Sequence, residues 1–139
     1  MARRRRRSIA IDFDGVIHRY SKGWNGGAIY DPPVDGARDA LARIHRRYNV
    51  IIFTTRVNPE MHGGDAQMEA VVAWLEENGF RRGEHFDEIT HVKQPALVYI
   101  DDRALRFTAW DTALQELDEL YPLGCHQTDG ITWSRTLCA

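Results

Sequence analysis

The chain has little of what marks several large classes of protein. Its 139 residues include only two cysteines, Cys125 and Cys138, which form neither a disulfide framework nor a zinc-ligand spacing. The sequence leaves one bridge between them open, but reduced thiols are the simpler expectation. No apolar run reaches the roughly 18 residues needed to cross a bilayer, so we expect no membrane-spanning helix. The remaining composition, 43% hydrophobic and 27% charged, is ordinary for a globular domain.

The chain also has little net charge, although its beginning is strongly basic. Residues 3–7 are five consecutive arginines, but Asp12 and Asp14 follow too soon for the apolar stretch of a signal peptide. We therefore expect a cytoplasmic protein. The net charge is −2, so the residues other than these five arginines carry −7 together. We expect residues 1–7 to form a solvated, disordered tail, with nucleic-acid contact as the alternative.

Apolar periodicity predicts strands that alternate with helices. Buried strands are expected at 8–13 and 50–53 and another clear strand at 96–100, with a shorter one at 86–90 and a terminal one at 125–133. Helices are expected from Val34 to about residue 48, with apolar positions 34, 37, 41, 44 and 48, then around 68–75 up to Gly79, and over 108–120. The last should open with a capping box at Thr108 and bury Trp110. This order predicts one α/β domain over residues 8–139, a three-layer Rossmann-like parallel sheet with helices on both faces.

Residues 16–34 break this pattern. They combine three glycines and two prolines with Tyr20, Trp24 and Tyr30, which predicts an aromatic loop or short β-flap. We call residues 16–34 the flap. Its aromatic side chains either pack the flap against the body or stack on a substrate, and packing is the simpler expectation.

The three clear strands all end in polar residues: Asp12 and Asp14, Thr54 and Thr55, and Asp101 and Asp102. Ligands bind outside the carboxyl ends of strands in such sheets, so these side chains should share one site. An Asp-x-Asp pair alone carries little weight among twelve aspartates, and Asp101-Asp102 alone could be a helix N-cap. Together, however, the carboxylates repel one another and favour Mg²⁺, which prefers oxygen ligands.

Four motifs in order resemble those of the haloacid dehalogenase (HAD) superfamily of phosphohydrolases. They are Asp12-Phe13-Asp14-Gly15-Val16, the threonine after Val50-Ile51-Ile52-Phe53, Lys93, and Asp101-Asp102. Each motif is weak by itself, but their joint order over roughly residues 8–110 is specific. Lys93 stands only eight residues before Asp101, a shorter interval than in relatives that place a helix there.

The resemblance implies a role for each of these residues. Asp12 would attack phosphorus to form an aspartyl-phosphate, and Asp14 would act as general acid and then base. Asp12, the main-chain carbonyl of Asp14, and Asp101 would hold Mg²⁺, with Asp102 close by. Thr54 and Lys93 would bind the transferring phosphoryl group. The carboxylate at Asp14 favours phosphate-ester hydrolysis over dehalogenation.

For other residues near the predicted site, the sequence allows more than one role. Gly15 permits a tight turn beside the substrate, and Thr55 is the alternative to Thr54, because only one of two successive strand residues faces the site. Arg56 and Arg103 either bind a substrate anion or pair with nearby acids. The Asp101-Asp102-Arg103 segment is also similar to the phosphatase domains of polynucleotide kinases. The six histidines show no ligand spacing, so surface or structural roles are expected for them.

The intervals between motifs have no room for a cap domain, which predicts an open site. We expect a small phosphorylated metabolite or nucleotide as substrate, with a nucleic-acid 3′ or 5′ end as the alternative. A homo-oligomer partner could close the site. A non-catalytic HAD-like binding domain is a third hypothesis.

Overall fold

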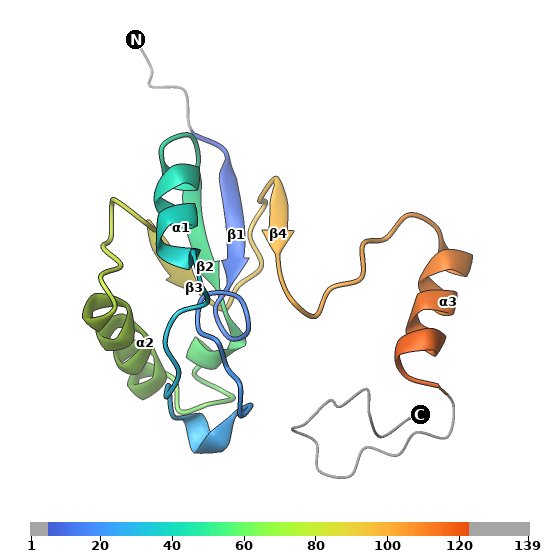
Figure 1. Ribbon diagram of the computed structural model, residues 1–139, viewed down its shortest axis with the longest axis horizontal. Helices are drawn as coiled ribbons and strands as arrows, with labels where there is room; N and C mark the ends of the chain where they lie inside the picture. The colour runs from blue at the N-terminus through green and yellow to red at the C-terminus, as the bar shows by residue number, and fades with distance from the viewer. Residues whose placement is uncertain (1–5, 123–139) are drawn as a thin grey trace. The chain divides into compact units, whose positions relative to one another are not determined.

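A computed structural model of the chain describes residues 6–122 (Figure 1). It divides into two compact units, Met1–Asp102 and Arg103–Ala139, and we describe each by itself. The first holds β1 (Ser8–Asp12), η1 (Asn25–Gly27), α1 (Ala37–His45), β2 (Asn49–Phe53), η2 (Thr55–Val57), α2 (Asp65–Glu77), β3 (Glu88–Thr90) and β4 (Val98–Ile100), and the second holds α3 (Trp110–Leu120). The strand predicted at 125–133 and most of the predicted tail lie outside the described residues.

The four strands form one sheet in the order β3-β2-β1-β4, and every neighbouring pair is parallel. The register aligns Ile11 of β1 with Ile52 of β2 and with Ile100 of β4. The prediction of an α/β protein with a parallel sheet is therefore confirmed. Because all strands run the same way, their carboxyl ends lie at one edge of the sheet and their amino ends at the other.

The hydrophobic core forms on one face of this sheet. Side chains alternate along a strand, so Ile9 and Ile11 share a face with Val50 and Ile52, while Ala10 and Ile51 point to the other face. The core cluster joins the first set to residues from α1 and α2, namely Ala37, Leu41, Val71, Trp74 and Leu75. Both helices thus pack on the same face, and each large side chain buried there contributes about 1.5–3 kcal/mol.

Helices α1 and α2 follow the predicted periodicity. In α1, Ala37 and Leu41 are buried and Ile44 is half-buried against the core, as are Val34 before the helix and Tyr48 after it. Helix α2 ends as predicted at a glycine. Gly79 has φ of +79°, and the next N–H donates to the carbonyl of Leu75 at 2.8 Å, which satisfies a free carbonyl of the last turn.

Two predictions about α3 are wrong. Trp110 is 72% exposed rather than core, and no residue of α3 is buried. The 3–4 spacing of its apolar residues correctly indicates an amphipathic helix, but a spacing does not determine how much of the apolar face is covered. The capping box at Thr108 is absent because the helix starts later, with Ala109 as N-cap and no side-chain hydrogen bond there. None of the helices within residues 6–122 is long and apolar enough to cross a membrane.

Candidate active site

Three aspartates meet at the carboxyl edge of the sheet. Asp12 is the last residue of β1, and Asp101 and Asp102 directly follow β4, its neighbour in the sheet. One carboxylate oxygen from each lies within 4.8 Å of the others. We call Asp12, Asp101 and Asp102 the acidic cluster. The structure thus brings Asp12 together with the acidic pair that the sequence placed at the end of a separate strand.

Gly15 makes room for this cluster. Its φ is +85°, in the left-handed region, and a Cβ built on it would lie 2.8 Å from the carboxyl carbon of Asp102. A side chain at this position would therefore carry both backbone strain and a collision. The glycine after the Asp-x-Asp pair lets the turn approach the acidic cluster closely.

The pKa of Asp12 is raised to about 8, first by burial and then by the charges of Asp101, Asp102 and Asp14, while a hydrogen bond from the N–H of Phe13, 2.8 Å from Oδ1, acts to lower it. The carboxylate form is thus costly unless a positive charge compensates it. Three converging oxygen ligands without histidine or cysteine suit a hard divalent cation, although exposed acidic groups also occur without one. The donor set therefore fits Mg²⁺.

The carboxylate of Asp14 accepts hydrogen bonds from groups outside the acidic cluster. Nε of Arg56 donates to Oδ2 at 2.9 Å, Nη2 of Arg56 donates to Oδ1 at 2.8 Å, and Nδ1 of His18 lies 2.9 Å from Oδ1. Burial alone raises the pKa of Asp14, but the hydrogen bonds from His18 and Arg56 outweigh it, and the pKa is lowered overall. Asp14 is thus held as a carboxylate.

Arg56 is 1% exposed and also binds groups beyond Asp14. Its Nη1 donates to the carbonyl of Gly27 at 2.8 Å and to Oε1 of Gln67 at 3.2 Å, and its guanidinium lies 4.6 Å from the ring centre of Trp24. Of the two roles that the sequence left open, the structure shows pairing with a nearby acid. Arg56 thereby ties Asp14 to the flap and to α2.

His18 is the residue of this network that the sequence did not single out. It is fully buried, and its Nε2 accepts from the N–H of Asp31 at 3.1 Å. Nδ1 is therefore the nitrogen that donates a hydrogen bond to Asp14. His18 lies four positions after Asp14, but this spacing has predictive value only in a helix, and here it falls in a loop.

The aromatic residues of the flap pack internally and against the body, as expected. Trp24 contacts Arg56 and also His62, whose ring centre lies 4.3 Å away. The hydroxyl of Tyr30 accepts from the N–H of Lys22 at 2.6 Å and donates to the carbonyl of Gly23 at 2.9 Å. The flap contains the short helix η1 and no strand.

Thr54 and Thr55, which follow β2, differ in how far they are exposed. Thr54 is 3% exposed, and its Oγ1 accepts from the N–H of Arg56 at 3.2 Å, which leaves the hydroxyl proton for another acceptor. Thr55 is exposed.

Lys93 lies in the loop between β3 and β4, with Nζ 5.6 Å from the ring centre of Tyr99. Arg103 is the first residue of the second unit.

Comparison of the chain with protein-family models, with curated proteins and with solved structures finds no match.

Proposed function

We propose that the protein is a Mg²⁺-dependent phosphomonoester hydrolase with a HAD-like, three-layer fold, and that Asp12 is its nucleophile. The observation that supports this most is the acidic cluster at the carboxyl edge of the parallel sheet, with its oxygens within 4.8 Å of one another. The order of the four sequence motifs adds to it.

Asp12, Asp101, Asp102 and the main-chain carbonyl of Asp14 are the proposed ligands of the metal. When bound, Mg²⁺ supplies positive charge that offsets the repulsion between a carboxylate and a phosphoryl group. The raised pKa of Asp12 supports this assignment, because this carboxyl group needs a cation beside it to be an anionic nucleophile near neutral pH.

The reaction has two displacements. First, a carboxylate oxygen of Asp12 bonds to phosphorus as the bond to the leaving oxygen breaks, and the leaving oxygen takes a proton. A water oxygen then bonds to phosphorus and loses a proton as the bond between phosphorus and the Asp12 oxygen breaks, which frees inorganic phosphate and the Asp12 carboxylate. Asp14 serves as acid in the first step and base in the second. The hydrogen bonds from Arg56 and His18 hold Asp14 ionised, which favours its role as a base most directly. To act as an acid, Asp14 must first lose one of these hydrogen bonds and bind a proton at that oxygen.

Thr54 and Lys93 are proposed to bind the transferring phosphoryl group. The buried Thr54 hydroxyl has its proton available, and its main chain follows β2, the strand next to β1. Lys93 supplies positive charge from the loop before β4. The proposed substrate is a small phosphorylated metabolite or nucleotide, because the sequence apart from Arg3–Arg7 is acidic overall.

Hydrolysis of p-nitrophenyl phosphate with and without Mg²⁺ tests this proposal. We expect Mg²⁺-dependent turnover by the unaltered chain and a loss of roughly 10³-fold or more in Asp12→Asn, because the nucleophile is removed. Asp35→Asn is the matched control, since the Asp35 side chain is 99% exposed and makes only a surface ion pair with Arg19. Undiminished Mg²⁺-dependent turnover by Asp12→Asn would contradict the proposal.

A further inference from the structure

Exposed arginines gather at the amino edge of the sheet. Two of them directly precede β1, and three lie in the last turn of α1 and the turn that leads into β2. All five are exposed. We call this set the arginine patch: Arg6, Arg7, Arg43, Arg46 and Arg47. In the sequence, Arg3–Arg5 immediately precede it.

Main-chain contacts hold the two halves of the patch together. The guanidinium of Arg6 donates to the carbonyls of His45 and Arg46 at 3.1 and 2.9 Å, which satisfies free carbonyls at the end of α1. The N–H of Asn49 donates to the carbonyl of Arg7 at 3.0 Å, and the side-chain amide of Asn49 donates to the carbonyl of Arg6 at 3.1 Å. The basic start of the chain is thereby fixed beside the basic end of α1.

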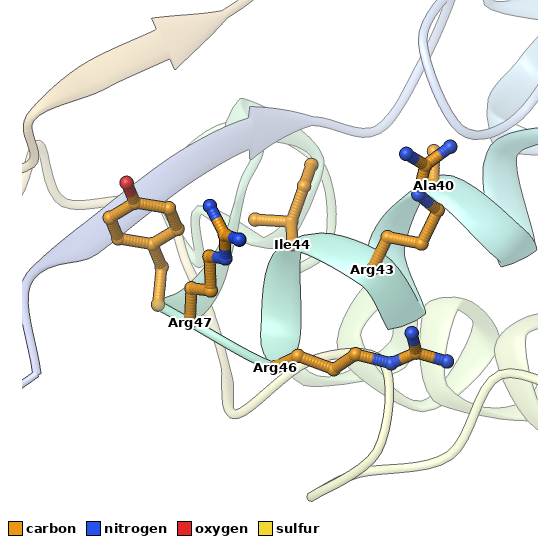
Figure 2. Close-up of a pocket in the computed structure, with 6 residues that line it drawn as sticks. Ala40, Arg43, Ile44, Arg46 and Arg47 are labelled. Carbon is orange, nitrogen blue, oxygen red and sulfur yellow. The ribbon is translucent and has the colours of Figure 1, made fainter.

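Three arginines of the patch, at and just after the end of α1, have no charged or hydrogen-bonded partner among the described residues. Within residues 6–122, the side chains of Arg43, Arg46 and Arg47 make no ion pair or hydrogen bond, whereas Arg56, Arg19 and others pair with carboxylates. The three positions are related by spacings of three and four, so their side chains lie close together at the end of the helix. They border a surface pocket of about 560 Å³ that also includes Ile44 (Figure 2).

The patch is separate from the acidic cluster. The five residues of β1 run between them, and at about 3.3 Å per residue this places them at least 13 Å apart, at opposite edges of the sheet. A polyanion at the arginine patch is therefore held away from the carboxylates, which would repel it. The five patch arginines carry +5, whereas the other residues of the chain together carry a net charge of −7, so positive charge is concentrated at the patch.

We propose that the arginine patch binds the phosphate backbone of nucleic acid. A guanidinium pairs with phosphate through two parallel hydrogen bonds, and the closely spaced phosphates of one strand reach several arginines at once. An anionic membrane fits less well, because the apolar side chains in the pocket, Ile44 and Tyr48, are half-buried against the core and offer no anchor for insertion. This site is independent of the proposed phosphatase activity.

Fluorescence anisotropy with a labelled single-stranded oligonucleotide of about 20 nucleotides tests the proposal. We expect binding at low salt that weakens as salt rises. Arg43→Gln, Arg46→Gln and Arg47→Gln combined should lower the affinity about 10- to 100-fold and reduce the slope of log affinity against log salt by about 2, since each lost phosphate contact contributes about 0.7.

The control combines Arg19→Gln, Arg38→Gln and Arg81→Gln, exposed arginines outside the patch whose loss changes the net charge equally. It should bind within about twofold of the unaltered chain, and thermal unfolding checks that both variants are folded. Equal losses in the two variants, or no binding at low salt, would overturn the proposal. The proposal would also be overturned if the unaltered chain, but not the patch variant, sedimented with phosphatidylserine vesicles and neither bound the oligonucleotide. That result would identify a membrane site instead.

Discussion

Replacing Asp12 by Asn should make the metal-free protein more stable at alkaline pH, although it removes the proposed nucleophile. The folded protein raises the pKa of Asp12 from 3.8 to about 8, with burial as the largest cause. Between these values the unfolded chain has lost the proton and the folded chain has kept it. The free energy of unfolding therefore falls as pH rises through this window.

The size of the effect follows from the same shift. One pKa unit corresponds to about 1.4 kcal/mol, so Asp12 lowers the free energy of unfolding by at most about 4 kcal/mol between pH 5 and pH 8. We expect about 2–4 kcal/mol. Asparagine carries no titrating proton, so the variant should lack this part of the pH dependence.

Urea unfolding in EDTA at pH 5 and pH 8 measures the difference, with Asp35→Asn as control. We expect the unaltered chain and the control to lose stability over this range and Asp12→Asn to lose at least about 2 kcal/mol less. Saturating Mg²⁺ at pH 8 should stabilise the unaltered chain much more than the variant, because a ligand stabilises the state that binds it. Equal pH dependence in all three proteins would refute the electrostatic account of the acidic cluster.

Four further substitutions test the surroundings of the site. Arg56→Gln leaves the Asp14 carboxylate without its buried partner, so we expect about 2–4 kcal/mol less stability in urea unfolding and an acidic limb of the pH–rate profile shifted to higher pH. Gly15→Ala should weaken Mg²⁺ binding about tenfold or more in calorimetric titration, because the new Cβ meets the acidic cluster. Thr54→Val should lower turnover of an aryl phosphate about 10-fold or more, whereas Thr55→Val should leave it unchanged, and equal effects would contradict the register.

Much of the sheet follows from local sequence. The apolar runs around Ile11 and Ile52 are short and rich in β-branched residues, and the helices between them repeat with spacings of three and four. The strand-end rule then brings Asp12 and Asp101 to one edge although 89 positions separate them in the chain. This step needs only parallel pairing, which the alternation of strands and helices predicts.

The network around Asp14 did not follow from sequence. Its partner Arg56 lies 42 positions away, and an arginine after a strand pairs with an acid or binds an anion depending on side-chain direction. His18 lies in an irregular loop, where no periodicity relates it to Asp14. The exposure of Trp110 was missed for a related reason, since an amphipathic pattern marks an apolar face without showing what covers it.

Detection of a phosphoryl group on Asp12 tests the central claim most directly. The unaltered chain and Asp14→Asn are mixed with aryl phosphate and Mg²⁺, quenched in acid and digested for mass spectrometry. The account predicts a gain of about 80 Da on the peptide that contains Asp12, larger in Asp14→Asn because removing the base slows hydrolysis of the intermediate. The mass gain should be absent when the Asp12→Asn substitution is introduced into either protein. A phosphoryl group on another residue, or turnover that continues in Asp12→Asn, would contradict the account.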